Sequence, residues 1–434
     1  MPSGVRVVTQ RVPGVRSVAL GFWIGTGSVA EPPEQAGISH LLEHMLFRGT
    51  RRHTSEEIDQ IFDAMGAEVN AGTDSEATSL YSRVLDRNLE RAFAVLGEML
   101  VAPRLSDLEA EREVVLEEIA MYEDDPQDVA FDALGNAVFG AHPLGRAVIG
   151  SAQTVGAITH AQVTEFHARH YVPENIVIAA AGSLEHDELV RMAQELESSR
   201  APGAAAGARG GDVPEHAFSF PPRVRFVRKD TEQYHVCFGG GGLARDDERR
   251  FALRVLEGVL GATSSSRLFQ EVRERRGLAY SVYSFSSLYA HTGEVGVYVG
   301  TRPEQLGPAL EVIAAELERF AREGADEQEL ERSRENLKGR VVLAMESTAA
   351  RMNHLGGAVI VGMPILTVDE LIERIDAVRA QDVAELAYSL FDPSALSVAC
   401  VGPDEEAFRA AMEPLRDGAG ADAREEDPAR AGAR

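Results

Sequence analysis

Two histidines and a glutamate near the N-terminus have a spacing that can bind a metal ion. The segment Gly37–Thr50 reads GISHLLEHMLFRGT and contains His40, Glu43 and His44. Residues four apart lie on one face of a helix, so we expect the two imidazoles to point together. Imidazoles at this spacing can hold zinc, which takes three protein ligands in catalytic sites. A carboxylate beside them can take a proton from the attacking water, and this is the role we expect for Glu43.

A second helix offers candidates for the third metal ligand. Residues 108–122 carry several glutamates, and Glu111 and Glu118 are spaced so that they fall within about 20° of one helix face. Apolar residues help to bury this side, and a carboxylate among them needs a partner such as a metal. The other glutamates of this helix are predicted to form an ordinary solvated face, namely Glu109, Glu113 and Glu117.

The elements that must position these residues are strands and capped helices. Arg6–Gln10 and Ser17–Trp23 alternate in the manner of strands. Residues Thr54–Met65 are predicted to form a helix that opens with a capping box and ends at Gly66. The pattern is that of a mixed fold in which helices pack on a sheet.

The sequence also contains an internal repeat. Residues 171–182, YVPENIVIAAAG, resemble residues 391–402, FDPSALSVACVG, and each copy reads as a buried strand that follows a helix. The interval is about half of the chain, so the simplest explanation is a duplicated unit of about 200 residues. The predicted fold is therefore α+β, with two homologous α/β-sandwich units.

The repeat sets the predicted domain boundaries. A metal-binding domain is expected at 1–199, a linker at 200–222, a second domain at 223–416 and a disordered tail at 417–434. Aligning Leu42-Glu43 with Leu256-Glu257 places Arg254 and Gly258 opposite the two histidines. The second unit has therefore lost its ligands, and one metal per chain is expected.

The composition excludes several classes of protein. The 434 residues include 43 basic and 69 acidic side chains, a net charge of −26, so nucleic acid and membrane surfaces are poor partners. Residues 51–150 hold 8 basic and 21 acidic side chains, which indicates either solvated helix faces or a surface that attracts basic peptides. The two cysteines cannot form a disulfide framework, and no apolar run is long enough to cross a membrane. A cytoplasmic location is expected.

Three segments together resemble one family of peptidases. HLLEHMLFRGT, NAGTDSEATSLY at 70–81 and EREVVLEEIAMYEDDP at 111–126 are similar to motifs of the insulinase, pitrilysin and mitochondrial processing peptidase family. Members of this family are zinc peptidases with the inverted H-x-x-E-H signature. The resemblance extends from about residue 5 to residue 415, and its size matches the small bacterial, processing-peptidase-like branch.

The resemblance implies a role for each residue of the metal site. It makes His40, His44 and Glu118 the zinc ligands, with Glu117 as the alternative register. It makes Glu111 a supporting carboxylate, of the kind that orients a metal-bound histidine.

The resemblance also implies residues that bind the substrate. In the segment VRERRGLAYSVYS, Arg273 and Tyr280 match a pair that hydrogen-bonds the scissile carbonyl as negative charge develops on it. The strand that pairs with an extended peptide is expected near Glu68–Gly72, with Asn70 and Ala71 in contact with the substrate.

The implied function is that of a zinc-dependent endopeptidase with one zinc per chain. It is expected to cleave extended, unstructured peptides, basic ones among them, inside the chamber of a homodimer whose sites are completed in trans. Two alternatives stay open, a protease dedicated to one precursor and a non-catalytic peptide-binding or scaffold subunit.

Overall fold

The protein is described here from a computed structural model that covers residues 1–200 and 218–416. The chain forms two compact units, each assembled from separate stretches of sequence. Unit 1 comprises Met1–Asp124, Ala141–His216 and Lys338–Arg374. Unit 2 comprises Asp125–Gly140, Ala217–Leu337 and Ile375–Arg434.

Unit 1 is built on a five-stranded sheet with the order β1-β5-β2-β4-β3. Its strands are β1 (Arg6–Arg11), β2 (Ser17–Ile24), β3 (Glu68–Thr73), β4 (Thr78–Leu85) and β5 (Ile176–Gly182). The pair β1 and β5 is parallel, and the other neighbours are antiparallel. The strands predicted at 6–10 and 17–23 are present, but β5 lies between them.

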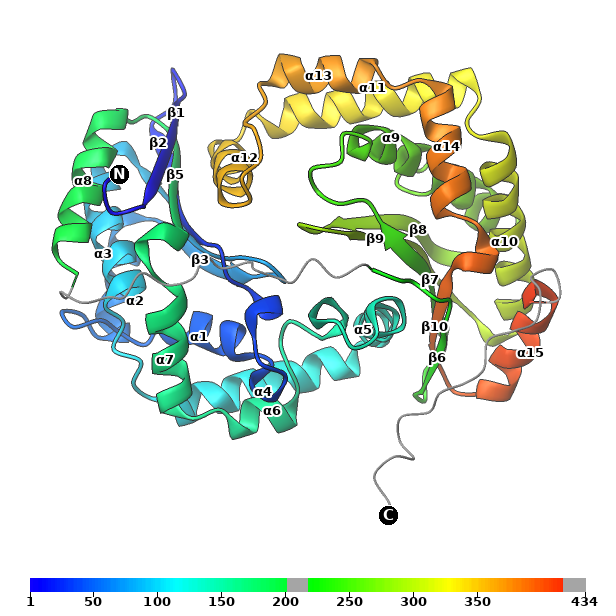
Figure 1. The fold of residues 1–434 in the computed structure, drawn as a ribbon, viewed down its shortest axis with the longest axis horizontal. Helices are drawn as coiled ribbons and strands as arrows, with labels where there is room; N and C mark the ends of the chain where they lie inside the picture. Colours follow the sequence, from blue (N-terminus) through cyan, green and yellow to red (C-terminus); the bar gives the residue numbers. More distant parts are fainter. Residues whose placement is uncertain (201–217, 417–434) are drawn as a thin grey trace. The chain divides into compact units, whose positions relative to one another are not determined.

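Helices cover one face of this sheet (Figure 1). They are α1 (Ile38–Leu46), α2 (Ser55–Met65), α3 (Leu89–Val101), α4 (Leu108–Asp124), α7 (His160–His170) and α8 (His186–Ser198). Leu20 and Phe22 of β2 enter the core beneath them, because alternate residues of a strand face the same side. The capping box predicted for α2 is present, and Gly66 closes the helix in the left-handed conformation. The fold therefore presents α1 and α4 as neighbours above the sheet.

The opposite face of the same sheet is covered by α12 (Thr348–Ile360). Trp23 of β2 packs there with Met352 and Leu355, together with alanines of β5. Trp23 lies so close to Gly356 that a β-carbon at this position would come within 2.5 Å of the ring. The contact of the large Trp23 side chain with Gly356 thus allows α12 to pack closely on this sheet.

Unit 2 repeats this arrangement with the strand order β6-β10-β7-β9-β8. Its strands are β6 (Val224–Arg228), β7 (Tyr234–Gly242), β8 (Ala279–Leu288), β9 (Gly293–Thr301) and β10 (Ser397–Gly402). Helix α5 (Pro126–Phe139) packs on β10 and β7, with Leu134 against Gly239. The remaining long helices of the C-terminal half are α9 (Arg250–Leu260), α10 (Leu306–Glu323), α11 (Glu327–Ala344), α13 (Val368–Asp376), α14 (Ala380–Leu390) and α15 (Glu405–Arg416).

The two sheets confirm the predicted fold of two similar α/β units. Their strand orders correspond position by position, and β5 and β10 fall on the two copies of the sequence repeat. Each of these strands follows a short 3₁₀ turn that begins at a proline, Pro173 in one and Pro393 in the other.

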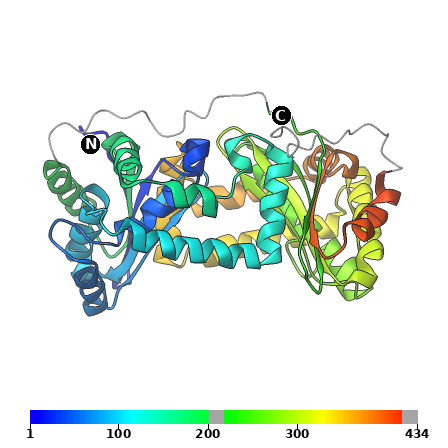
Figure 2. The same ribbon diagram turned by 90° about the horizontal axis from the view of Figure 1, so that it is seen from below.

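The units differ from the continuous halves predicted at 1–199 and 223–416. Helix α5, which directly follows α4 in the chain (Figure 2), belongs to unit 2, and α12 belongs to unit 1. A repeat in sequence shows that two units exist, but not which copy supplies the helix for the second face of each sheet. Most of the predicted linker, residues 201–217, and the predicted tail at 417–434 lie outside the described residues.

Both cysteines are free and buried. Cys237 is paired across the sheet with Ala399, so Cys400 points to the other face and cannot bond to it. Among the described residues, no helix is both long and apolar enough to cross a membrane.

Candidate metal centre

Helices α1 and α4 bring two imidazoles and a carboxylate together in unit 1. The carboxylate Oε2 of Glu118 lies 3.7 Å from Nε2 of His40 and 3.4 Å from Nε2 of His44. The ligand atoms of these three residues all lie within 4.8 Å of one another. Ligands of a tetrahedral zinc are about 3.3 Å apart, and two histidines with a glutamate form a known catalytic zinc set. The three residues therefore fit one zinc ion.

The protonation of His40 suits a metal ligand. Burial, followed by the nearby His44, lowers the pKa of His40 to about 4. The ring is therefore neutral at physiological pH and has a nitrogen lone pair to offer.

Glu111 contacts His44 on the side away from Glu118, and Arg48 contacts Glu111 in turn. Oε2 of Glu111 lies 3.4 Å from Nδ1 of His44, the ring nitrogen opposite to the one that faces Glu118. The Glu111 side chain is buried and also contacts the guanidinium of Arg48. A carboxylate in this position fixes the orientation of a metal-bound imidazole. Arg48 was not anticipated from the sequence; it lies in the turn that follows α1, four residues after His44.

Glu43 lies between the ligands and the edge strand β3. Its Oε2 accepts a hydrogen bond of 2.6 Å from the hydroxyl of Thr73. Burial raises the pKa of Glu43, and the Thr73 hydrogen bond opposes this rise. A carboxylate whose pKa is raised is a stronger base, which suits a group that must take a proton from water.

Glu31 sets the start of the metal-site helix. Its buried carboxylate accepts hydrogen bonds of 2.8 Å from the backbone N–H groups of Gly37 and Ser39, two donors that the helix itself leaves unpaired. Burial raises the pKa of Glu31 to about 7. Gly37 has φ 94°, and a β-carbon there would come within 2.6 Å of the Ile149 carbonyl oxygen. The start of α1 is thereby held one turn ahead of the ligands.

The predicted substrate strand is at an edge of the sheet. Asn70 and Ala71 lie on β3, whose strand neighbour is β4 alone among the described residues. The exposed and half-buried residues of β3 alternate, and Asn70 is exposed. The outer edge of this strand is therefore able to accept a further strand.

Arg273 and Tyr280 come together in unit 2 on two irregular pieces of backbone. Arg273 lies in a single π-helical turn, Phe269–Glu274, and Tyr280 lies at a β-bulge near the start of β8. The guanidinium of Arg273 donates a 3.2 Å hydrogen bond to the Tyr280 carbonyl and lies 4.4 Å from the centre of its ring. The Tyr280 side chain is 77% exposed. Both kinds of irregularity are frequent at functional sites because they redirect a side chain.

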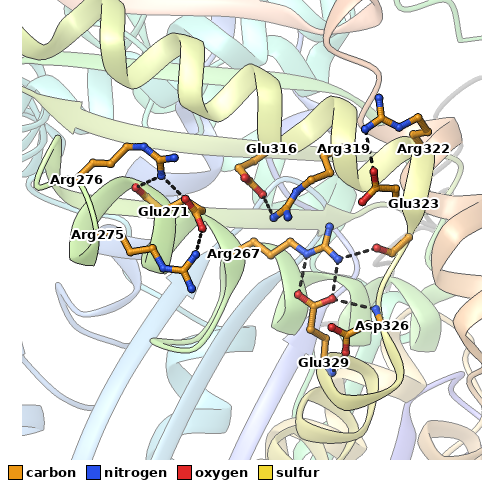
Figure 3. A network of polar contacts seen from close by, with 11 residues as sticks. Arg267, Glu271, Arg275, Arg276, Glu316, Arg319, Arg322, Glu323, Asp326 and Glu329 are labelled. Carbon is orange, nitrogen blue, oxygen red and sulfur yellow. Dashed lines mark hydrogen bonds and ion pairs between the residues drawn. The ribbon is translucent and has the colours of Figure 1, made fainter.

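The neighbouring arginines have structural partners of their own. Glu271 binds the guanidinium groups of both Arg275 and Arg276 (Figure 3). These contacts lower the pKa of Glu271, Arg276 contributing most. Arg273 is not among the partners of Glu271 and lies instead 3.5 Å from the carboxylate of Glu274.

The corresponding place in unit 2 holds an ion pair instead of metal ligands. Arg254 and Glu257 of α9 are joined at 3.1 Å, and Glu257 is buried. A side chain at Gly258 would collide with Ser333 of α11. Within the described residues, the His40, His44 and Glu118 group is the one cluster that could hold a metal.

The other paired histidines have structural roles. His167 bonds to the carbonyl of Leu100 at 2.8 Å, and His170 packs on Phe166 with ring centres 4.3 Å apart. These contacts make both residues packing groups of unit 1.

Comparison with known proteins places the chain in a family. The model of the insulinase family, peptidase family M16, matches residues 6–152, and a model described as the peptidase M16 inactive domain matches residues 157–337. A protein of Streptomyces coelicolor described as an uncharacterized zinc protease is 40% identical over 415 residues, which cover 94% of this chain and 90% of that protein. The uncharacterized zinc protease YmxG of Bacillus subtilis is 40% identical over 391 residues, covering 90% and 94%.

Solved structures share the fold at lower identity. A peptidase M16 inactive domain from Pseudomonas fluorescens has a TM-score of 0.84 at 22% identity, with 93% of this chain and 97% of that chain covered. A protease from Helicobacter pylori has a TM-score of 0.85 at 21% identity, with 92% and 97% covered. The predicted family is confirmed, and the chain belongs to the insulinase family, peptidase family M16.

Proposed function

We propose that the protein is a zinc-dependent endopeptidase with one zinc per chain. The observation that carries this proposal is the group of His40, His44 and Glu118, with the carboxylate of Glu43 beside it. The descriptions of its relatives as zinc proteases agree with it. The rival function, a non-catalytic scaffold subunit, is disfavoured because none of the residues needed for catalysis is missing.

The chain's own residues supply the proton transfers. Glu43 has one oxygen held by Thr73, so its other oxygen is available to take a proton from the attacking water and to return it to the leaving amine. When bound, zinc would supply a Lewis acid for the scissile carbonyl and would acidify that water. Arg273 and Tyr280 offer donors for the negative charge that develops on the carbonyl oxygen.

The substrate we propose is an extended peptide that adds to the edge of β3. Backbone pairing at an open edge gives affinity with little sequence preference. Asn70 and Ala71 lie on this strand and would contact the peptide. An unstructured substrate suits this mode, because the backbone N–H and C=O groups of its segments are not already paired within a fold.

Replacing Glu43 tests the mechanism. The Glu43→Gln protein should bind one zinc per chain, as measured by elemental analysis, and should lose cleavage of a short unfolded peptide by at least about 100-fold. Full activity in this variant would reject Glu43 as the base. A chelator should abolish cleavage by the native protein, and added zinc should restore it.

A panel of substrates separates general peptide disposal from the processing of one precursor. Similar cleavage of many unfolded peptides, with folded proteins left intact, indicates disposal. Cleavage of a single sequence indicates a dedicated processing enzyme.

A preference for basic peptides is also proposed, from the acidic excess in residues 51–150. Salt screens the attraction between charges. Raising the salt concentration should therefore weaken cleavage of Arg- and Lys-rich peptides more than cleavage of neutral ones. An equal salt response would assign the acidic excess to solubility.

We further propose a homodimer in which Arg273 and Tyr280 serve the zinc site of the partner subunit. The support is the family resemblance together with the placement of the two clusters in different units. Mixing a His44→Ala protein with an Arg273→Ala protein should restore part of the activity. Absence of rescue in confirmed mixed dimers would argue against sites completed in trans.

A further inference from the structure

Thr73 makes the hydrogen bond that holds the proposed catalytic base. Its hydroxyl donates to Oε2 of Glu43 at 2.6 Å, and this is the one hydrogen bond of the Glu43 side chain within the described residues. Thr73 is the last residue of β3, whereas Glu43 lies on α1. The bond therefore ties the metal-site helix to the edge strand.

The position of Thr73 is fixed by the hairpin to which it belongs. Thr73 is paired in register with Thr78 of β4, and Asp74 closes the turn by accepting bonds of 2.7 Å from the N–H groups of Glu76 and Ala77. The Thr78 hydroxyl donates to the carbonyl of Thr26 at 2.9 Å in a buried position. The Thr73 hydroxyl also lies 3.4 Å from the Thr78 hydroxyl, but its 2.6 Å contact with Glu43 is much shorter, and an ionised carboxylate can only accept, so Thr73 donates its proton to Glu43.

We propose that Thr73 is a positioning residue for Glu43, an inference that rests on the proposed peptidase function. A carboxylate on a rotatable side chain can turn away from its target, and a hydrogen bond to one oxygen limits this rotation. With Oε2 held, the other oxygen keeps a constant direction for the water. The strand that would hold the peptide also holds the base, so both are placed relative to the same backbone.

A purely structural role for Thr73 makes a different prediction. If its hydroxyl only stabilises the hairpin, its loss should lower the melting temperature while the turnover of the folded protein stays unchanged. If it positions Glu43, turnover should fall in a protein that is still folded and still binds zinc.

Valine, serine and alanine at this position separate the two roles. Thr73→Val keeps the branched shape and removes the hydroxyl, and kcat should fall about 10- to 100-fold, the usual effect of one hydrogen bond to a charged group. KM and the zinc affinity, measured by chelator competition, should stay within about twofold because neither ligands nor strand edge has changed. Thr73→Ser should restore kcat to within about threefold of the native value. Thr73→Ala should reproduce the loss if the valine protein does not fold.

The matched control is Thr9→Val, which removes a threonine hydroxyl from β1 at the opposite edge of the same sheet. It should leave kcat unchanged. An active native protein with an unchanged kcat in Thr73→Val would overturn the positioning role and leave the peptidase function intact. A native protein that binds zinc but cleaves no peptide would overturn both.

Discussion

At the scale of single residues, the rotation of α4 about its axis decides which glutamate could be the third metal ligand. Glu117 and Glu118 are adjacent on α4, yet Glu118 turns toward α1 while Glu117 is exposed. The register that the resemblance favoured is the one that the structure brings to the histidines, and Glu111 lies on the same side, one helical repeat earlier.

The two neighbouring glutamates provide a matched pair of variants. Glu118→Gln should weaken zinc binding by at least about 100-fold, because it removes a charged ligand, whereas Glu117→Gln should leave it unchanged. Glu111→Gln should weaken binding by about 10- to 100-fold. Competition with a chelator measures the zinc affinity of all three variants. Equal affinities of Glu118→Gln and Glu117→Gln would show that neither glutamate is the third zinc ligand.

His170 should make folding sensitive to acid. Burial, followed by the charge of Arg169, lowers its pKa to about 4 in the folded state, whereas an unfolded histidine takes up a proton near pH 6.5. The unfolded state then binds more protons between these values, so stability is lost as the pH falls through this window.

Replacing His170 should remove part of this acid sensitivity. Between pH 7.5 and 4.5, the His170→Gln protein should lose about 1–3 kcal/mol less unfolding free energy than the native protein. Urea unfolding at the two pH values measures the difference. The same change at the exposed His160 is the control. A His170→Gln protein that loses as much unfolding free energy between the two pH values as the native protein would contradict the assignment.

At the scale of elements, close packing makes α12 specific for the sheet of unit 1, although this helix comes from the second half of the sequence. Gly356→Ala should lower the unfolding free energy by about 1–3 kcal/mol, because the new methyl group overlaps the ring of Trp23. Gly357→Ala is the matched control, since nothing lies within 4 Å of a β-carbon there and alanine favours a helix. Thermal unfolding that ranks the two variants in the opposite order would contradict this packing.

At the scale of the whole molecule, the exchange of α5 and α12 joins the two halves of the sequence. Unit 1 contains α12 from the second half, and unit 2 contains α5 from the first. Each half, expressed alone, would leave one face of its sheet uncovered. An exposed apolar sheet face promotes association with other protein molecules.

Cutting the chain between the halves tests this exchange. Residues 1–200 and 218–434, produced as two separate chains, should elute together from a gel-filtration column and part only in denaturant. An N-terminal fragment that elutes alone and folded would show that it does not need α12.

The sequence by itself determined the features that depend on neighbours along the chain. The spacing of His40, Glu43 and His44, the α2 capping box and the repeated strand are all local patterns, and the structure contains each of them. The helix period places His40 and His44 on one face without any knowledge of the fold, and the repeat indicates two units, whereas the choice of Glu118 as the third candidate ligand rested on the family resemblance.

Only the tertiary structure decided which distant groups meet. The contacts of Arg48 with Glu111 and of Thr73 with Glu43 each join separate segments, and no periodicity links their members. The exchange of α5 and α12 is of the same kind. A sheet needs both faces covered, but any apolar helix can satisfy this need, and the choice between the helices of the two copies is made by shape, as between Trp23 and Gly356.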